Sequence, residues 1–378
     1  MGGRKCQVEG LVINRGFWRG RRVFLTGHTG FIGAWMCLVL RSLGAEIKGL
    51  ALAPDDDRNL FVVAGVDQDI THCVADIRNP AVVRESISRA EPEIVMHLAA
   101  QALVRRSFAE PVETYDTNVM GTVHVLEAVR HASSVKAALI ITSDKCYENV
   151  EWVWGYREND LLGGRDPYSN SKACAELVTD AYRRTFFQSE GSASIASARA
   201  GNVIGGGDWS PDRLVPDAVR AFMAGEPLRL RSPQAVRPWQ HVLDPILACL
   251  QLAERLVKDG SKFADCWNFG PAATSEISVA KLADELVSLW GDGARWIRVE
   301  GVHSPEASCL KLDCSKAISM LAWRPVLDLS EALRLTLDWY QAFARSDDMR
   351  KFTLAQIAST LNGETVRDGI APQLVASY

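Results

Sequence analysis

The sequence predicts an α/β protein with a Rossmann-type, doubly wound parallel sheet and a smaller C-terminal substrate-binding lobe. Three observations predict this class. A glycine-spaced turn joins an apolar strand to a helix within residues 22–35, strand-like and helix-like segments alternate to about residue 200, and loops rich in Gly, Pro and Trp follow. Such alternation is typical of a parallel sheet with crossover helices. A chain of 378 residues is long enough for two lobes.

The first turn carries the glycine spacing G-x-x-G-x-x-G, in the order Gly27, His28, Thr29, Gly30, Phe31, Ile32, Gly33. The first glycine permits a sharp turn, the second lets a pyrophosphate approach the backbone, and the third lets the helix pack closely on the sheet. The helix N-terminus then offers free N–H groups and a positive dipole end. An ordinary strand–helix turn is the alternative. The position after a strand and before an amphipathic helix at 31–43 favours dinucleotide binding.

The remaining elements follow in order along the chain. We expect strands at 23–26, 46–50, 72–74, 94–98, 137–142 and 194–199, and helices at 31–43, 80–90, 112–131 and 168–187. Further helices are expected at 279–290 and 330–344, within the loop-rich second lobe. The predicted organisation is an N-terminal extension at 1–16, a dinucleotide-binding domain at 17–200, a mainly substrate-binding lobe at 201–345 and a polar tail at 346–378.

Composition excludes several classes of protein. Hydrophobic residues make up 47% of the chain, charged residues 23%, and the formal net charge is −4. Lys and Arg are scattered among acids, so we expect no nucleic-acid partner. No apolar run approaches the roughly 20 residues of a membrane span, so we expect no membrane partner. The nine cysteines have no metal-ligand spacing, which predicts no metal and a reducing, cytoplasmic location.

Two groups of residues carry the predicted chemistry. Tyr168 and Lys172 lie one helical turn apart, and a fixed cation lowers the pKa of a phenol, which can then take a proton from a sugar hydroxyl. The strand at 137–142 ends in Ser143, Asp144 and Lys145, at the edge where parallel sheets present catalytic groups. A dehydrogenase needs only the serine, so the acid and the base indicate a second reaction. The alternative for them is a solvated charge pair.

Nine segments of the chain resemble the extended short-chain dehydrogenases that dehydrate nucleotide sugars. The resemblance extends from residue 17 to about residue 340. Its motifs are FWRGRRVFLTGHTGF at 17–31, ADIRN at 75–79, HLAAQALVRRS at 97–107, TSDKCYEN at 142–149, PYSNSK at 167–172, RAGNVIGGGDW at 199–209, RPWQHVLDP at 237–245, WNFGP at 267–271 and EASCLKLDCSKA at 306–317. The Ser-Asp-Lys triplet is the most specific of them, because related enzymes acting on dTDP-glucose typically carry Thr-Asp-Glu there.

The resemblance implies internal redox chemistry on a CDP-hexose, with NAD as a cofactor that is regenerated in each cycle. Tyr168, assisted by Lys172 and Ser143, would deprotonate the C4 hydroxyl as hydride passes to the cofactor. Lys145 would remove the C5 proton, Asp144 would protonate the departing C6 hydroxyl, and hydride would return to C6. The choice of cytosine rests on the resemblance alone. A homodimer or a dimer of dimers, built on the helices at 112–131 and 168–187, and a role in deoxysugar synthesis for surface polysaccharide are also implied.

The resemblance also assigns binding residues. Asp76 and Ile77 would meet the adenine, and Asn118 would support the active site. The nicotinamide side would be lined by Leu98, Ala99, Ala100, Gln101 and Thr142. Substrate contacts would come from Ser143, Asn202, Arg213, Leu214, Arg237, Trp239 and His241. The chain departs from the pattern at Ala53, where an acid would hold the adenosine ribose, and at Ile32, where close relatives carry lysine.

His97 ends the strand at 94–98 in an apolar stretch, and we interpret it as structural. Two other functions stay open at this point. A different nucleotide-sugar dehydratase or a C4 epimerase would use the same fold, and a dinucleotide-sensing protein could keep the fold without catalysis. The joint presence of Tyr168, Lys172, Asp144 and Lys145 argues against the sensor, which would not need all four.

Overall fold

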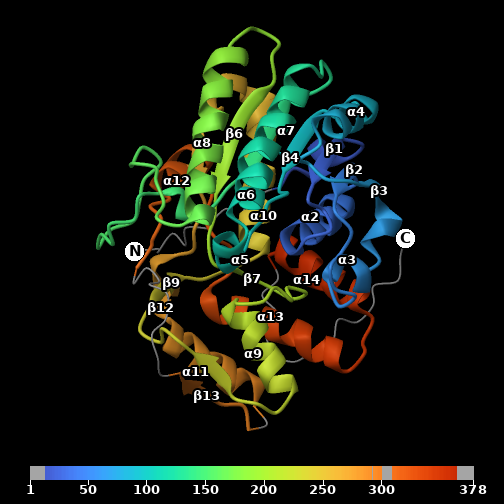
Figure 1. The fold of residues 1–378 in the computed structure, drawn as a ribbon. Helices are drawn as coiled ribbons and strands as arrows, with labels where there is room; N and C mark the ends of the chain where they lie inside the picture. Colours follow the sequence, from blue (N-terminus) through green and yellow to red (C-terminus); the bar gives the residue numbers. More distant parts are fainter. Residues whose placement is uncertain (1–12, 292, 300–308, 364–378) are drawn as a thin grey trace, which may run out of the picture.

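A computed structural model describes residues 13–291, 293–299 and 309–363. Its centre is a seven-stranded sheet in the order β11-β6-β5-β4-β1-β2-β3, in which every neighbouring pair is parallel. The strands are β1 (Arg22–Thr26), β2 (Glu46–Ala51), β3 (Thr71–Val74), β4 (Ile94–His97), β5 (Ala137–Ile141), β6 (Ser194–Arg199) and β11 (Cys266–Asn268). The predicted doubly wound parallel sheet is therefore confirmed, as Figure 1 shows.

Helices cover both faces of this sheet. One face carries α4 (Pro80–Ala90), α6 (Pro111–Tyr115), α7 (Gly121–Arg130) and α8 (Pro167–Phe186), which lie side by side in Figure 1. The other face carries α2 (Phe31–Ser42) and α10 (Leu243–Asp259). Two buried apolar clusters result, one on each side of the sheet, and they include Phe24 and Leu25 of β1 respectively. Strands buried on both faces explain the continuous apolar runs in the sequence.

Local sequence signals fix the ends of several of these helices. Asp166 caps α8 by accepting a hydrogen bond from the Ser169 N–H, and Pro167 occupies the first turn. Asn79 and Pro80 begin α4 in the same way. The helix expected at 330–344 begins at Leu329, because Asp328 and Glu331 form a capping box. Helix 80–90 and strand 194–199 have the predicted bounds.

A second lobe lies below the carboxyl edge of the sheet in Figure 1. Its helices include α9 (Leu214–Met223) and α11 (Val279–Trp290), whereas α12 (Ser315–Leu321) packs on β11 beside the sheet. Its strands form three short pairs: β7 (Val203–Ile204) with β10 (Gln240–His241), β9 (Val236–Pro238) with β12 (Glu276–Ser278), and β8 (Leu228–Leu230) with β13 (Trp296–Arg298). Helices α13 (Leu329–Ala344) and α14 (Met349–Leu361) pack together, and α14 also contacts α2.

The structure differs from the sequence expectations in three places. The single helix expected at 112–131 is α6 and α7 joined by a π-helical turn, η2 (Asp116–Met120), and the short helix α5 (Val104–Ala109) precedes it. Residues 243–268 return to the sheet as α10 and β11, because α10 is apolar along most of its surface and needs a buried position. Helix α14 occupies the segment expected to be a polar tail and buries Met349, Thr353 and Ile357.

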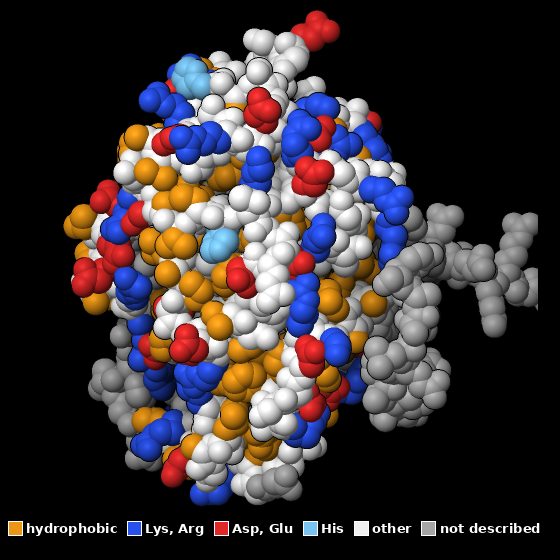
Figure 2. Space-filling model, turned by 90° about the vertical axis from the view of Figure 1, so that its right-hand side faces the viewer, with side chains coloured by type: hydrophobic (Ala, Val, Ile, Leu, Met, Phe, Trp, Pro, Cys, Tyr) orange, Lys and Arg blue, Asp and Glu red, His pale blue; other side chains and the backbone are white. Residues whose placement is uncertain are grey.

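Six shorter elements complete the described chain: α1 (Arg15–Trp18), α3 (Leu60–Val63), η1 (Val66–Asp69), η3 (Asp144–Cys146), η4 (Gly260–Lys262) and η5 (Ala273–Ser275). Three parts of the sequence predictions lie outside the described residues: residues 1–12 of the N-terminal extension, part of the motif at 306–317 and the end of the tail at 364–378. On the face drawn in Figure 2, basic and acidic side chains are interspersed and apolar side chains lie between them.

Candidate active site

The glycine turn between β1 and α2 has the shape that a pyrophosphate needs. Gly27 has φ +77°, and a Cβ there would lie 2.6 Å from the Ala99 nitrogen. A Cβ on Gly33 would lie 2.1 Å from the Gly27 carbonyl oxygen, so only glycine allows this close packing. Gly30 begins α2 without any side-chain cap, and no acidic residue lies in the first turn of that helix. This helix end therefore offers uncapped N–H groups and a positive dipole to an anion.

The side chains of this turn point into the protein. His28 is fully buried against Phe61 and His72, and burial lowers its pKa to about 4. Thr29 donates a hydrogen bond to the Leu52 carbonyl at 2.9 Å. Phe31 is buried, and Ile32 packs on the same apolar cluster. Only the backbone of these residues is therefore left to face a bound pyrophosphate, and their side chains fix the shape of the turn by packing.

Asn118 organises the loop after β4 that was expected on the nicotinamide side. It lies in the π-helical turn η2, accepts a hydrogen bond from the Gln101 N–H at 2.8 Å and donates to the Gln101 carbonyl at 3.0 Å. It also donates to the Ser171 hydroxyl at 2.9 Å. The π turn thus ties the loop of Leu98, Ala99, Ala100 and Gln101 to helix α8, and such turns are frequent at functional sites.

His97 has the structural role that its apolar surroundings predicted. Its Nδ1 lies 2.7 Å from the Thr26 hydroxyl and its Nε2 lies 3.2 Å from the Thr122 hydroxyl. Burial, followed by the Lys172 charge, lowers its pKa to about 3, so the ring is neutral at pH 7. A neutral, doubly hydrogen-bonded ring joins β1, β4 and α7.

The two residues expected to meet the adenine already have contacts within the protein. Asp76 accepts from the Arg78 guanidinium at 2.6 Å, which lowers the pKa of that carboxyl, and Ile77 is buried against Gly121. Near Ala53, the Arg58 guanidinium pairs with Asp56 at 2.5 Å and lies 4.6 Å from the centre of the Trp209 ring. The cation near the ribose position is therefore already compensated.

The Ser-Asp-Lys triplet follows β5 as the one-turn helix η3 (Asp144–Cys146). Asp144 is fully buried, and its Oδ1 accepts from the Ser143 hydroxyl at 2.9 Å and from Lys145 Nζ at 3.1 Å. Its other oxygen, Oδ2, has no hydrogen-bond partner in the described protein. Gly201 lies directly against this carboxylate, because a Cβ there would be 2.0 Å from Oδ2. The triplet is thus a compact acid–base pair rather than a solvated one.

Tyr168 faces this triplet from helix α8. Burial raises the pKa of Tyr168, while the Lys145 charge, the neighbouring Ser143 side chain and the Arg213 charge all favour its phenolate. The expectation that the neighbouring lysine of the helix gives the phenol a net lowered pKa is therefore wrong for the protein alone. Desolvation exceeds the effect of the cations, of which Lys145 has the largest effect. Burial lowers the pKa of Lys172 to about 8, although Glu176 opposes this.

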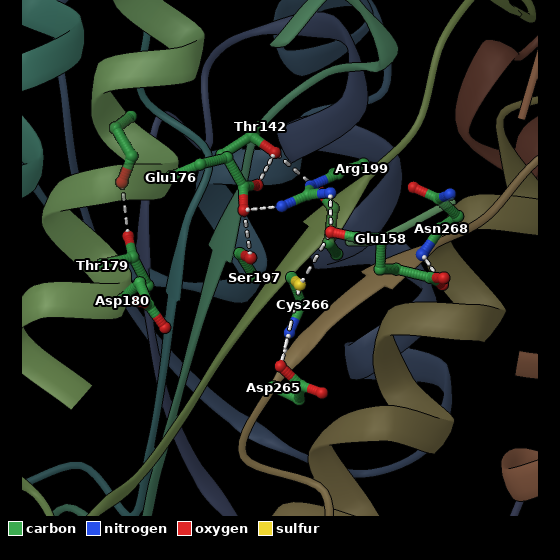
Figure 3. Close-up of polar contacts among 12 residues, drawn as sticks. Thr142, Glu158, Glu176, Thr179, Asp180, Ser197, Arg199, Asp265, Cys266 and Asn268 are labelled. Atoms are coloured by element: carbon green, nitrogen blue, oxygen red, sulfur yellow. Dashed lines mark hydrogen bonds and ion pairs between the residues drawn. The ribbon is translucent and has the colours of Figure 1, made fainter. Parts of the chain in front are cut away.

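Glu176 and Arg199 form a buried ion pair behind the triplet that sequence reasoning missed (Figure 3). Their charged atoms are 2.7 Å apart. The Thr142 hydroxyl donates to Glu176. Spacing could have identified Glu176, because it lies one turn beyond Lys172 on the same helix face.

Four of the predicted substrate residues form two pairs with different environments: Arg213 with Leu214, and Asn202 with Trp239. Arg213 pairs with Asp208 at 3.0 Å and is near enough to favour the Tyr168 phenolate, and Leu214 follows it as the first residue of α9. Asn202, with φ +49°, and Trp239 each have a buried N–H group without a described partner.

Arg237 donates to the Val236 carbonyl at 2.9 Å. His241 differs from the others. It is fully buried, its ring centre lies 5.8 Å from that of Trp35, and burial lowers its pKa to about 3. The structure thus places its ring in the protein interior.

No group of three or more His, Cys, Asp or Glu side chains in the described ranges could hold a metal ion. The eight cysteines of that part of the chain are free thiols. None of the helices among these residues is long and apolar enough to cross a bilayer.

A dinucleotide turn, a Tyr-x-x-x-Lys helix and a second lobe over the carboxyl edge of a parallel sheet define an extended short-chain dehydrogenase. The chain belongs to the GDP-mannose 4,6 dehydratase family, whose sequence profile matches residues 24–336. It is 47% identical to a CDP-glucose 4,6-dehydratase from Salmonella typhimurium, over 94% of this chain and all of that protein. A dTDP-glucose 4,6-dehydratase from Streptomyces antibioticus is 29% identical over 84% of this chain and 92% of its own length.

Solved structures share the same fold. A UDP-glucose 4-epimerase from Thermotoga maritima superimposes with a TM-score of 0.74 at 22% identity, covering 85% of this chain and 99% of that one. A dTDP-glucose 4,6-dehydratase from Streptomyces venezuelae gives 0.73 at 23% identity, covering 86% and 98%. Because both dehydratases and epimerases share this fold, the reaction must be argued from the site.

Proposed function

We propose that this chain is an NAD-dependent hydro-lyase that converts CDP-glucose to CDP-4-keto-6-deoxyglucose and water. The observation that carries the proposal is the contact of Asp144 with both Ser143 and Lys145, beside Tyr168. An epimerase or a simple dehydrogenase needs the tyrosine and the serine, but not an additional buried acid–base pair. The Salmonella CDP-glucose 4,6-dehydratase, 47% identical, supports the choice of CDP-glucose.

The glycine turn fits the pyrophosphate of NAD, because Gly27 and Gly33 leave room for close backbone packing and Gly30 leaves the α2 N-terminus uncapped. Bound there, NAD would supply a hydride acceptor for the sugar and a donor for the return of that hydride. Asn118 holds the Gln101 backbone on one side of the site, and Lys172 supplies a fixed cation on the other.

The protein's own groups move the protons. Tyr168 takes the C4 hydroxyl proton, assisted by the neighbouring Ser143 hydroxyl. The resulting ketone acidifies the C5 hydrogen, which Lys145 removes as a neutral amine. Asp144 protonates the C6 hydroxyl, which leaves as water. Arg213 and Arg237 contribute cations for the substrate diphosphate.

The ion pair between Asp144 and Lys145 opposes these roles, because an ionised carboxylate cannot act as an acid and an ammonium cannot act as a base. Neutral Lys145 with protonated Asp144, however, holds the same number of protons as the ion pair. The Lys145 side chain is 30% exposed, whereas Asp144 is buried. A bound sugar that covers Lys145 removes its solvent and shifts the shared proton toward the carboxyl. No exchange with solvent is needed.

One assay tests the proposal. Purified protein is mixed with CDP-glucose without added NAD, and the product is analysed for loss of one water and a ketone at C4. We expect turnover with cofactor that co-purifies. Parallel reactions with dTDP-, GDP- and UDP-glucose test the base preference. A product that still bears its C6 hydroxyl would indicate an epimerase and overturn the dehydratase assignment.

We propose further that the protein forms a homodimer through helices α6, η2 and α8. Large apolar side chains are exposed along this helical face: Val112, Tyr115, Met120, Leu177 and Phe186. Leu177 is 58% exposed and lies in the middle of α8, so its contact with a second copy would bury the apolar surface that it now exposes. Leu177→Arg should produce monomers in analytical ultracentrifugation, whereas Leu289→Arg on α11, also exposed, should not. A wild-type monomer would contradict the proposal.

The free cysteines support a reducing compartment, and we propose the cytoplasm. The product of the proposed reaction has a ketone at C4 and no hydroxyl at C6. Such a sugar suits further reduction or amination, which supports a role in deoxysugar synthesis for surface polysaccharide such as the O-antigen of lipopolysaccharide.

A further inference from the structure

A polar stripe continues along the buried face of α8 beyond the tyrosine and the lysine. Tyr168, Lys172 and Glu176 follow one another at four-residue intervals and are 7%, 6% and 3% exposed. The proposed mechanism uses the first two and not the third. A carboxylate this deeply buried is costly unless its charge and its oxygens are compensated. Its partners therefore indicate what it does.

The partners of Glu176 come from two neighbouring strands (Figure 3). The Thr142 hydroxyl, at the end of β5, donates to Oε1. The Ser197 hydroxyl and Arg199 Nη2, both on β6, each donate to Oε2 at 2.7 Å. Thr142 immediately precedes the Ser-Asp-Lys triplet. Glu176 thus joins the helix that carries Tyr168 and Lys172 to the strand that carries the acid and the base.

Arg199 extends this connection to the other side of the triplet. Its Nη1 donates to the Tyr147 hydroxyl at 2.6 Å and to the Glu158 carbonyl at 3.1 Å. Two residues further on, Gly201 lies against the Asp144 carboxylate. The ion pair therefore links three segments of the site: the helix, the triplet and the glycine that seats the acid.

Glu176 also affects the charge of the Lys172 side chain. Around Lys172, Glu176 favours the ammonium and burial opposes it, while burial keeps both the His97 ring and the Cys146 thiol neutral. Around Tyr168 lie Lys145, Ser143, Asp144 and Arg213. Without the Glu176 carboxylate, Lys172 would lose the largest effect that opposes its desolvation, and the Arg199 cation would be left unpaired in the same interior.

We infer that Glu176 is a positioning residue for the proposed dehydration: it holds α8 against the ends of β5 and β6 and keeps Lys172 positively charged during turnover. The inference rests on the proposed function for its kinetic test only. Because the amine at position 172 has a pKa of about 8, the pH at which activity falls on the alkaline side is a direct readout.

The first test is Glu176→Gln, which keeps the side-chain shape and removes the charge. We expect the alkaline limb of the kcat profile with CDP-glucose to move to lower pH, by up to about one unit, because the Glu176 carboxylate is the largest effect that favours the Lys172 ammonium. Glu176→Asp should keep the wild-type limb at a lower kcat. Asp180→Asn is the control, because Asp180 pairs with Arg183 and Arg184 on the same helix and should leave the profile unchanged.

A second variant separates charge from folding, because Glu176→Gln alone leaves Arg199 buried and unpaired. Glu176→Gln with Arg199→Met replaces the pair by neutral groups, which is often tolerated well. We expect stability near that of the wild type and an alkaline limb that remains shifted. A double variant with the wild-type limb and kcat would show that the pair is only structural and would overturn the inference.

A substrate-free measurement keeps the two proposals separate. Titration of Lys172 by NMR of ¹⁵N-lysine-labelled protein, assigned with Lys172→Arg, should give a lower pKa in Glu176→Gln than in the wild type. Equal values would overturn the inference whatever the substrate is. Wild-type protein that does not dehydrate CDP-glucose would instead overturn the proposed function, and this titration would still decide the role of Glu176.

Discussion

Gly201→Ala tests how tightly the proposed acid is seated. A Cβ at this position would lie 2.0 Å from Asp144 Oδ2 and 2.1 Å from its Cγ, whereas Cβ contacts under 3.0 Å essentially never occur. The two groups must therefore separate by about 1 Å, and Asp144 is held by Ser143 and Lys145 on its other oxygen. A misplacement of about 1 Å costs roughly 10²-fold in rate, and overpacking costs about 1–3 kcal/mol of stability.

The assay is the rate of 4-keto sugar formation, with thermal unfolding measured on the same samples. Gly225→Ala is the control: Gly225 has φ +71° and no neighbouring atom within 4 Å of an added Cβ, so it should lose about 1 kcal/mol of stability and no activity. We expect Gly201→Ala to form product about 100-fold more slowly than the wild type. A rate within threefold of wild type would refute the seating of Asp144 by this glycine.

Two further predictions concern charge. Lys145→Ala should still transfer hydride to bound NAD, but more slowly, because Lys145 also favours the Tyr168 phenolate. The variant should incorporate solvent deuterium at C5 about 10³-fold more slowly than the wild type. Normal exchange, measured by mass spectrometry, would rule out Lys145 as the base. Burial raises the pKa of Asp244 to about 7, whereas the same carboxyl in the unfolded chain loses its proton near pH 4. Proton binding to Asp244 therefore stabilises the folded protein at low pH, and this stabilisation is lost as the pH rises from about 4 to 7. Asp244→Asn should therefore lose less stability than the wild type between pH 5 and 8 in urea unfolding, and parallel losses would contradict this.

The sequence predicted the parts of the fold that depend on local pattern. The glycine turn, the six strands up to residue 199 and the helix of Tyr168 all follow from apolar runs, glycine spacing and capping residues. Residues 243–268 could not be placed in the same way. They contain a long apolar run, but no local pattern says where that run packs, and their position in the fold follows from apolar surface that is buried only when the chain returns to the sheet.

Within the candidate site, the predictable contacts were those between neighbours in sequence. The triplet and the Tyr-Lys pair are of this kind, and the partners of Asn118 could be placed only by structure. Gly201 and Asp144 meet because β5 and β6 are adjacent strands, which one sequence does not state. His241 was assigned to the substrate through the family resemblance alone, and the structure buries its ring beside Trp35. Glu176 could have been predicted from helical spacing alone.

The late strand β11 pairs with β6 on the outer edge of the sheet, and α10 covers the face beneath β5 and β6. A fragment ending at residue 200 would therefore keep the cofactor turn but expose a bare strand edge and an uncovered apolar surface, which favours aggregation. The nucleotide-binding half is thus not separable by truncation. Any split-protein or fusion design for this chain must keep residues 243–268 with the first 200, and cut in a surface loop of the second lobe instead.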